Sequence, residues 1–319
     1  MGTWQRLRMD GRVGMSYAAM NGARRLVQRM VPMGDPRLAQ LNRKRIRKLE
    51  TWFAHEFADV LSRWERTPES AEPFVTVHRA PIWMMWLQGA EAIPTQAKPF
   101  IDSVRRANPD MDVRIVDLDE IRTLVGIPDV IERRFEEGVL TGAQFSDYLR
   151  FRLLEQYGGI WMDCSLYQTE HTPVDTVLGV PCWSVKGLAS FPYATAMPDA
   201  LDWQVYYMAS QPHALFNRVM LDLTEEYWRR FDTIVDYFLT YYLACLARSV
   251  PAVRDSYARV PENNTMCEQP MAWIGGQSAM SEEALITECR ESGTWLYKTS
   301  LHENDDNIAR FRALMHQLE

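Results

Sequence analysis

The sequence predicts an α/β fold in which a mostly parallel sheet is flanked by helices and preceded by a helical N-terminal extension. One observation is that short apolar runs suited to buried strands alternate with stretches of helical periodicity, which is typical of a parallel sheet covered by helices. Another is that apolar residues recur at helical spacing ahead of the first such strand. We therefore divide the chain into a basic helical extension, residues 1–72, and a main domain, residues 73–319.

Local signals mark the elements of the extension. Asp35-Pro36 predicts a helix start, because Asp caps a helix and Pro suits its first position. From Leu38 to Trp64 the apolar residues follow one helical face, which predicts a single long amphipathic helix that Thr67-Pro68 ends. A shorter helix is predicted over residues 16–30.

In the main domain the first strand is predicted by the continuous apolar run from Ile82 to Leu87, which ends at Gln88-Gly89. Gly158-Gly159 ends a helix and precedes a short strand at residues 160–162. The other predicted elements are strands over 113–116, 180–185 and 295–301, and helices over 94–107, 119–125, 129–137, 141–156, 213–231 and 233–249.

Composition indicates a folded protein. A hydrophobic fraction of 47% with 11 Trp, 13 Tyr and 12 Phe excludes a disordered chain. No apolar run approaches the ~18 residues that a membrane-spanning helix needs. Arg6, Arg8 and Arg12 stand where a signal peptide requires apolar residues, so we expect a cytoplasmic protein. The five cysteines include no CxxC pair, which argues against a disulfide framework or a zinc site.

Charge is unevenly distributed along the chain. Residues 1–50 carry 12 Lys/Arg and 3 Asp/Glu, a balance of +9, while the whole chain is −7, so residues 51–319 carry −16. This is not the footprint of a nucleic-acid-binding protein, and we expect no nucleic-acid partner. Two interpretations stay open: peripheral docking on an anionic membrane surface at the inner face of the plasma membrane, or a solvated extension whose arginines pack on the acidic body.

Three charged residues form the main candidate site. Asp163 directly follows the apolar strand Ile160-Trp161-Met162, and ligands of open α/β sheets bind beyond the carboxyl ends of strands. A carboxylate buried there needs a cation, and Mg²⁺ or Mn²⁺ is held by one or two carboxylates together with phosphate oxygens. Asp147 and Arg150 share one face of the preceding helix. An aspartate accepts from sugar hydroxyls and an arginine fork binds diphosphate oxygens, so the pattern suits a metal-bound diphosphate attached to a sugar.

Other residues are weaker candidates. Trp86 ends the first strand, where its flat face could stack on a nucleotide base. His302 follows a predicted strand and could return to the metal or the diphosphate. Asp236 interrupts an aromatic-rich predicted helix, where it contacts donor or acceptor, or faces solvent.

These motifs together resemble the capsular polysaccharide synthesis proteins. The chain is also similar, more distantly, to the DXD-containing sugar transferases of glycosyltransferase family 32. The resemblance covers residues 82–169 and is carried by Ile82-Trp83-Met84-Met85-Trp86-Leu87-Gln88-Gly89, Asn108-Pro109, Phe145-Ser146-Asp147-Tyr148-Leu149-Arg150 and Tyr157-Gly158-Gly159-Ile160-Trp161-Met162-Asp163. It implies a GT-A-like fold for residues 73–319, a nucleotide-sugar donor and a divalent cation, Mn²⁺ or Mg²⁺.

The resemblance also implies roles for residues. Trp86 contacts the base, Asp147 and Arg150 hold the donor, and Asp163 is the first aspartate of the metal motif. Ser165 stands where a second aspartate is found in the distant relatives, whereas the capsular proteins often carry a small hydroxyl residue there. Further candidates for binding the donor are Gln88, Ser146, Trp161 and Lys298. Ser165 and His302 are further candidates for binding the metal, and Asp236 is a candidate catalytic residue in addition to Asp163.

The resulting prediction is a nucleotide-sugar-dependent hexosyltransferase. It moves a sugar from a UDP- or GDP-sugar to a surface or capsular glycan, which could be lipid-linked, with the assistance of a metal. The alternative is a non-catalytic scaffold of a capsule-assembly complex that keeps the fold. Ser165 favours the scaffold, and the set of Trp86, Asp147, Arg150 and Asp163 favours the enzyme.

Overall fold

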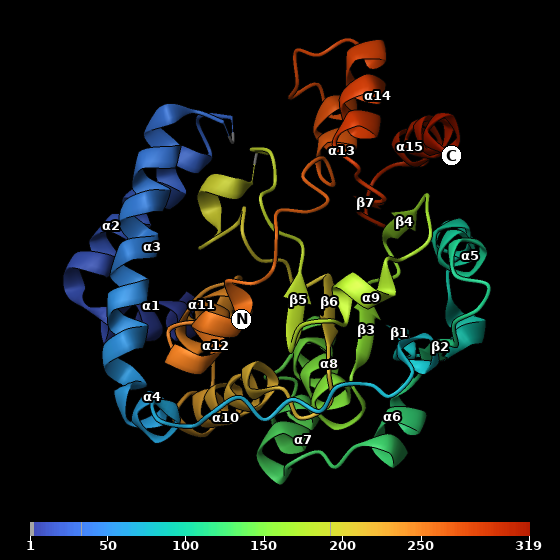
Figure 1. The fold of residues 1–319 in the computed structure, drawn as a ribbon. Helices are drawn as coiled ribbons and strands as arrows, with labels where there is room; N and C mark the ends of the chain where they lie inside the picture. The colour runs from blue at the N-terminus through green and yellow to red at the C-terminus, as the bar shows by residue number, and fades with distance from the viewer. Residues whose placement is uncertain (1–2, 33, 192) are drawn as a thin grey trace.

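The structure is a computed structural model that describes residues 3–32, 34–191 and 193–319. Its central sheet has five strands in the order β2 (Val113–Val116), β1 (Ile82–Met85), β3 (Gly159–Met162), β6 (Tyr207–Ser210) and β5 (Cys182–Ser184) (Figure 1). The strand β1 pairs in parallel with β2 and β3, whereas β6 runs antiparallel to both β3 and β5. Four strands therefore share one direction, which confirms the predicted mostly parallel sheet.

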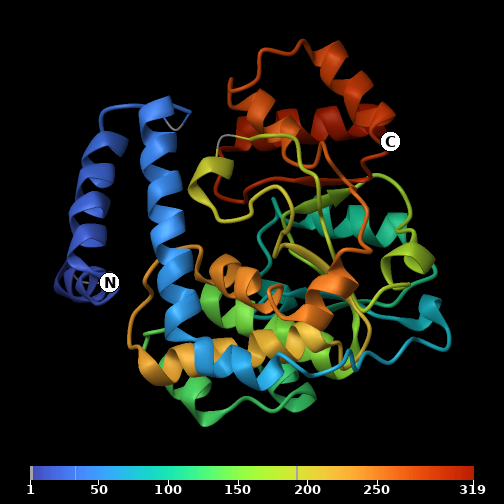
Figure 2. The ribbon, with the colours of Figure 1, turned by 60° about the vertical axis from the view of Figure 1, so that its left-hand side comes forward.

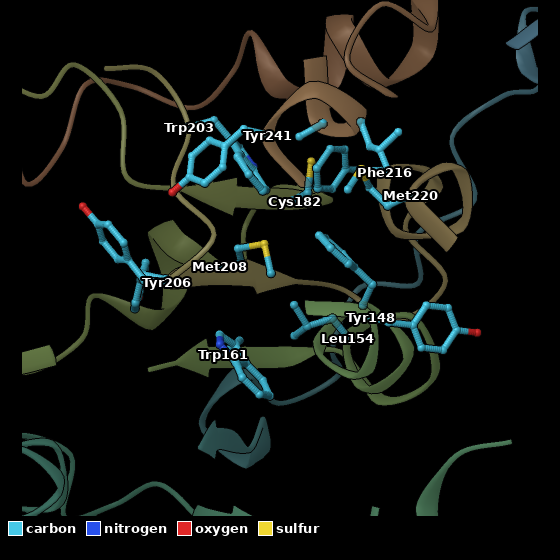
Figure 3. Close-up of a cluster of buried hydrophobic side chains, with 14 of the residues drawn as sticks. Tyr148, Leu154, Trp161, Cys182, Trp203, Tyr206, Met208, Phe216, Met220 and Tyr241 are labelled. Carbon is cyan, nitrogen blue, oxygen red and sulfur yellow. The ribbon is translucent and has the colours of Figure 1, made fainter. Parts of the chain in front are cut away.

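Helices flank this sheet and form the main hydrophobic core together with it. The helix α8 (Gly142–Tyr157) contacts β3 and β6, and α10 (Leu215–Arg230) packs along α8. Figure 3 shows how side chains from three neighbouring strands and these two helices meet in one buried cluster. Its members include Met208 of β6, Cys182 of β5, Leu154 of α8, and Phe216 and Met220 of α10.

A second layer lies beyond one end of the central sheet. Its two strands, β4 (Leu166–Gln168) and β7 (Leu296–Lys298), pair antiparallel, and α5 (Lys98–Ala107) packs on β4. Three C-terminal helices gather next to it in Figure 1 and share a separate small core with it. They are α13 (Gln269–Ile274), α14 (Glu282–Glu291) and α15 (Asp305–Leu318).

The N-terminal extension is helical, as predicted. Its α3 (Pro36–Glu56) begins at the expected cap, where the Asp35 side chain accepts from the Arg37 amide at 2.8 Å. The predicted single long helix is in fact two, because Phe57 (φ −111°, ψ 19°) interrupts it before α4 (Ala58–Trp64). Figure 2 shows α3 standing against the body and inside the outer pair α1 (Thr3–Val13) and α2 (Met15–Gln28).

The structure differs from the sequence prediction in several places. The predicted helix over 233–249 starts only at Leu239, because residues 233–238 form turns, and β4 and β6 were not predicted. No helix of the described ranges combines the length and the apolar character needed to cross a bilayer. The other helices are α6 (Leu118–Leu124), α7 (Asp129–Glu136), α9 (Val174–Val177), α11 (Leu239–Ala247), α12 (Pro251–Tyr257) and three short 3₁₀ turns at Val77–Arg79, Ala90–Ala92 and Ala194–Ala196.

The double glycine joins α8 to β3 in the smallest possible space. Gly158 and Gly159 have φ of +62° and +99°, a region that side chains disfavour. A Cβ on Gly159 would lie 2.4 Å from the Pro81 carbonyl oxygen, and one on Gly158 would lie 2.6 Å from Pro212 Cδ. Only glycine fits both positions. The sharp turn sets β3 beside β1, so that the residue after β3, Asp163, emerges next to one face of α8.

Candidate active site

A cavity of about 930 Å³ opens beyond the carboxyl ends of β1 and β3. Trp86 follows β1, and Asp163 and Ser165 follow β3, and all three line the cavity. The N-terminal half of α8 forms one wall, and residues 298–303, which begin at the last residue of β7, form another. This is the position at which open α/β sheets bind their ligands.

Arg150 is the centre of a charged wall that it forms with Asp147 and Asp163. Its side chain is 5% exposed, and its Nη2 and Nη1 lie 2.9 Å from Asp147 Oδ1 and 3.5 Å from Asp163 Oδ1. The guanidinium also donates to the Val205 carbonyl at 2.7 Å and stacks 4.8 Å above the Trp161 ring centroid. One buried cation therefore lies between the two aspartates that the sequence singled out, and holds them together.

Asp163 is fixed at the strand end by several contacts. Its Oδ1 accepts from Trp161 Nε1 at 2.9 Å, and its backbone amide donates to the Tyr206 carbonyl at 2.9 Å. The Leu166 amide donates to the Asp163 carbonyl at 3.0 Å and closes the turn into β4. With 29% of its side chain exposed, Asp163 still presents its carboxylate to the cavity.

Asp147 is held from a second direction by a residue that the sequence did not indicate. Its Oδ2 accepts from the Thr240 hydroxyl, on α11, at 2.7 Å. Burial raises the pKa of the Asp147 carboxyl, and both Arg150 and the Thr240 hydrogen bond oppose this shift. Ser146 supports the same arrangement, since its carbonyl and hydroxyl oxygens each accept from Arg150 at 3.3 Å.

A second cation faces the cavity from β7. The Lys298 ammonium donates to the Ser165 hydroxyl and, at 2.8 Å, to the Thr299 carbonyl. It lies 5.6 Å from the Tyr206 ring centroid. Nearby, burial raises the pKa of the Glu268 carboxyl, and Lys298 lowers it in part. A carboxyl with a raised pKa in a cavity is a candidate for acid–base chemistry.

The other predicted residues are distributed as follows. Trp86 is half-buried and His302 exposed, and both line the cavity. The Trp161 ring also lines it but lies beneath Arg150, so it supports the charged wall. Gln88 is exposed and lies outside the lining. Asp236 also lies outside it, because its carboxylate forms a buried ion pair with Arg45 of the extension.

The residues around Asp163 are compatible with a divalent cation that the protein holds mainly through one carboxylate. Within residues 3–32, 34–191 and 193–319, no three His, Cys, Asp or Glu side chains are grouped to hold a metal by themselves. Carboxylates nevertheless outnumber cations in the lining, so a bound diphosphate would need added positive charge. Asp163 with phosphate oxygens and water is a donor set typical of Mg²⁺. Ser165 could join it only after releasing Lys298.

Several lining residues escaped sequence analysis because no local pattern marks them. Glu268 precedes a short helix in a segment without a motif, and Thr240 lies within an aromatic run. Tyr193 and Tyr237 are exposed at 53% and 81%, and only the tertiary structure brings them to one cavity. An aromatic residue in a sequence can belong to the core or to the surface, so residue type alone does not place Tyr193 or Tyr237 at the cavity.

Similar proteins include fungal glycosyltransferases. The chain is 24% identical over 147 residues to the probable glycosyltransferase FCK3 of Fusarium pseudograminearum, which covers 42% of this chain and 36% of that protein. It is 28% identical over 124 residues to the glycosyltransferase afumC of Aspergillus fumigatus and to the O-glycosyltransferase braB of Annulohypoxylon truncatum. These matches cover 36% of this chain and 30% and 28% of the two proteins. The chain thus spans about a third of the length of these relatives.

A solved structure and a family model extend the comparison to most of the chain. The PaToxG glycosyltransferase aligns over 89% of this chain and 97% of its own, at 16% identity and a TM-score of 0.43. The model of the capsular polysaccharide synthesis proteins matches residues 42–316, from α3 into α15. That match includes every residue of the charged wall as well as Lys298 and His302. The chain belongs to the capsular polysaccharide synthesis protein family.

Proposed function

We propose that this protein is a glycosyltransferase that moves a hexose from a UDP- or GDP-sugar to a glycan acceptor. The observation that carries the proposal is the single buried Arg150, which joins Asp147 and Asp163 at the ligand-binding edge of the sheet. Such a wall offers acceptors for sugar hydroxyls next to cations for a diphosphate. The family and the names of the curated relatives support sugar transfer.

The donor would lie along the charged wall. The half-buried Trp86 offers its ring to the base, and Asp147 accepts hydrogen bonds from the sugar hydroxyls. Lys298 would move from Ser165 to the diphosphate oxygens, because a lysine ammonium is a mobile point charge on a flexible stem. Arg150 holds both aspartates in place while the donor enters.

Metal assistance is part of the proposal. Asp163 would hold the cation, with Ser165 and His302 as further ligands, and the cation would neutralise charge on the departing nucleoside diphosphate. Arg150 fixes the orientation of Asp163 through Oδ1, and Trp161 donates to the same oxygen. The carboxylate is thus preorganised, which is the main contribution of a protein to such a site.

The acceptor would enter past another part of the cavity lining, which we call the acceptor side. That side is aromatic and apolar, and two of its rings, Tyr193 and Tyr237, are exposed. Flat aromatic faces suit the apolar faces of sugar rings, and the apolar lining also suits the lipid carrier of a growing surface glycan. The side comprises Phe191, Tyr193, Met197, Ile234, Tyr237, Phe238 and Met271.

Calorimetric titration with a panel of UDP- and GDP-sugars, with and without manganese, tests the proposed function. We expect one donor to bind with a manganese-dependent increase in affinity and to be hydrolysed slowly when no acceptor is present. The scaffold alternative, which Ser165 favours, predicts neither binding nor hydrolysis. If the wild-type protein bound no member of the panel, that result would contradict the proposed transferase function.

We further propose that the extension rests on the cytoplasmic leaflet of the membrane, where a lipid-linked acceptor would be found. One exposed face of α3 carries four cations, and two apolar side chains in and just after the neighbouring α2 are 59% and 65% exposed. A basic face beside exposed apolar groups suits an anionic lipid surface. The residues are Arg43, Lys44, Arg47 and Lys48 on α3, and Leu26 and, just beyond the end of α2, Met30.

Sedimentation with anionic liposomes tests the membrane proposal. We expect the full chain to sediment at low salt and to be released as salt rises, because each nearby Lys or Arg contributes about 1 kcal/mol that salt screens. Replacing the four α3 cations with serine should release the protein at lower salt. The matched control removes four exposed arginines elsewhere and should sediment like wild type: Arg254, Arg259, Arg290 and Arg312. Binding that does not depend on salt, or no binding, would contradict the proposal.

A further inference from the structure

We propose that Arg45, in the N-terminal extension, is a positioning residue for the donor site. This proposal rests on the function proposed above. Arg45 projects from α3 into the body, with its side chain 6% exposed. It forms a buried ion pair with Asp236, whose side chain is 5% exposed. The same guanidinium donates to the Ala196 carbonyl at 2.6 Å. One side chain of the extension thus binds two separate segments of the main domain.

Both of these segments form walls of the cavity. Tyr193 and Met197 lie on either side of Ala196 in the sequence, and both line it. Ile234 and Tyr237 lie on either side of Asp236 and also line it. Because Arg45 joins the two segments from behind, it sets how far apart the walls stand while remaining outside the cavity itself.

A short chain of contacts links Arg45 to the donor aspartate. Asp236 Oδ1 accepts from the Phe238 amide at 3.0 Å, and the Asp236 carbonyl accepts from the Leu239 amide at 3.2 Å. These two bonds order the turn that starts α11. The next residue, Thr240, donates to Asp147 Oδ2 at 2.7 Å. The orientation of the Asp236 carboxylate therefore determines where the hydroxyl that holds Asp147 is placed.

Other ion pairs between the extension and the body differ from this one. Arg63 pairs with Asp222 at 2.9 Å and Arg8 pairs with Asp232 at 2.8 Å, and both arginines are more than half exposed. None of these four residues lines the cavity. A buried ion pair adds little stability compared with apolar side chains of similar size, and in some proteins such a pair instead specifies one geometry. The Arg45–Asp236 pair fixes the geometry of the acceptor side and, through Thr240, that of Asp147.

The first test compares two double variants by calorimetry with the best-bound member of the UDP- and GDP-sugar panel. Arg45→Met with Asp236→Asn removes both charges together, so no lone charge stays buried, and the amide oxygen can still accept from Phe238. We expect the Kd for the nucleotide sugar to rise about tenfold, the effect of losing one charge-assisted hydrogen bond, with the Kd for the bare nucleoside unchanged. Arg63→Met with Asp222→Asn is the matched control and should bind like wild type.

A double-mutant cycle then asks whether the effect passes through Thr240. Thr240→Val removes the donor to Asp147 and should raise the Kd for the nucleotide sugar by a similar factor. If Arg45 acts through Thr240, adding Thr240→Val to the Arg45 and Asp236 changes should raise the Kd by less than the product of the two factors. Independent effects, or an unchanged Kd in the Arg45 and Asp236 variant, would overturn the proposal.

Amide hydrogen exchange gives a readout that needs no donor. Residues 233–241 should exchange faster in the Arg45→Met, Asp236→Asn variant and at the wild-type rate in the Arg63 and Asp222 control. Unchanged exchange in that segment would also overturn the role of Arg45. If the wild-type protein bound no nucleotide sugar, the proposed function would fail, and the exchange of residues 233–241 would still decide whether Arg45 holds this segment.

Discussion

Replacing Asp163 with alanine should abolish sugar transfer and the manganese-dependent part of nucleotide affinity. Asp163 is the one carboxylate that emerges directly from the end of β3 into the cavity, where the diphosphate is proposed to bind. Removing it leaves a divalent cation without its main protein ligand. Transfer should fall to background, and titration with the bound nucleotide sugar should give one Kd with and without manganese.

The asparagine variant separates the charge of Asp163 from its hydrogen bond. Asp163→Asn keeps an oxygen that can accept from Trp161 Nε1, which lies 2.9 Å from the native carboxylate. It should unfold at nearly the same urea concentration as wild type but bind nucleotide without manganese dependence. Wild-type manganese dependence in both variants would show that Asp163 is not the metal ligand.

Replacing Arg150 with alanine should weaken both the fold and donor binding. Removing one partner of a buried ion pair typically costs about 3–5 kcal/mol, because the other charge is left uncompensated. Here two carboxylates, of Asp147 and Asp163, lose their shared cation. Urea unfolding should show this loss of stability, and the Kd should rise more for the nucleotide sugar than for the bare nucleoside. Equal losses for the two ligands would reject the placement of Arg150 beside the sugar and diphosphate.

The Arg150→Ala variant should also respond differently to pH. Burial already raises the pKa of Asp147, and without Arg150 that pKa should rise further. The folded state would then retain a proton that the unfolded state releases, so stability should fall as pH rises from the unfolded pKa to the raised folded pKa. Adding Asp147→Asn should recover part of the loss. Arg152→Ala, on the same helix but bonded to the Gly126 carbonyl, is the control and should lack this pH dependence.

The local parts of the fold could be predicted from the sequence because each has its own signal. The apolar runs locate β1 and β3, the double glycine locates the turn between α8 and β3, and Asp35-Pro36 locates the start of α3. Because ligands of open α/β sheets bind beyond the strand ends, these signals predict that Asp147, Arg150 and Asp163 share one crevice. The structure brings these three side chains together at the cavity.

The parts that sequence analysis missed depend on contacts between distant segments. The reversed strand β6 is specified by its pairing with β3 and β5, and its four residues carry no distinctive pattern. Asp236 looks like an anomaly within a helix until Arg45 of the extension provides its partner. Thr240 and Glu268 reach the cavity through tertiary packing alone. A single sequence contains no local signal for such pairings.

The glycine turn has a consequence for the length of the motif that follows it. Side chains alternate between the two faces of a strand, so Trp161 and Asp163 share a side, as the hydrogen bond between them requires. Gly159 is fixed against Pro81 at the other end of β3. One residue inserted or deleted between Gly159 and Asp163 would turn the carboxylate to the opposite face of the sheet, away from Arg150. A change in length by a single residue would therefore remove the carboxylate from the site even if every residue type of the motif were kept.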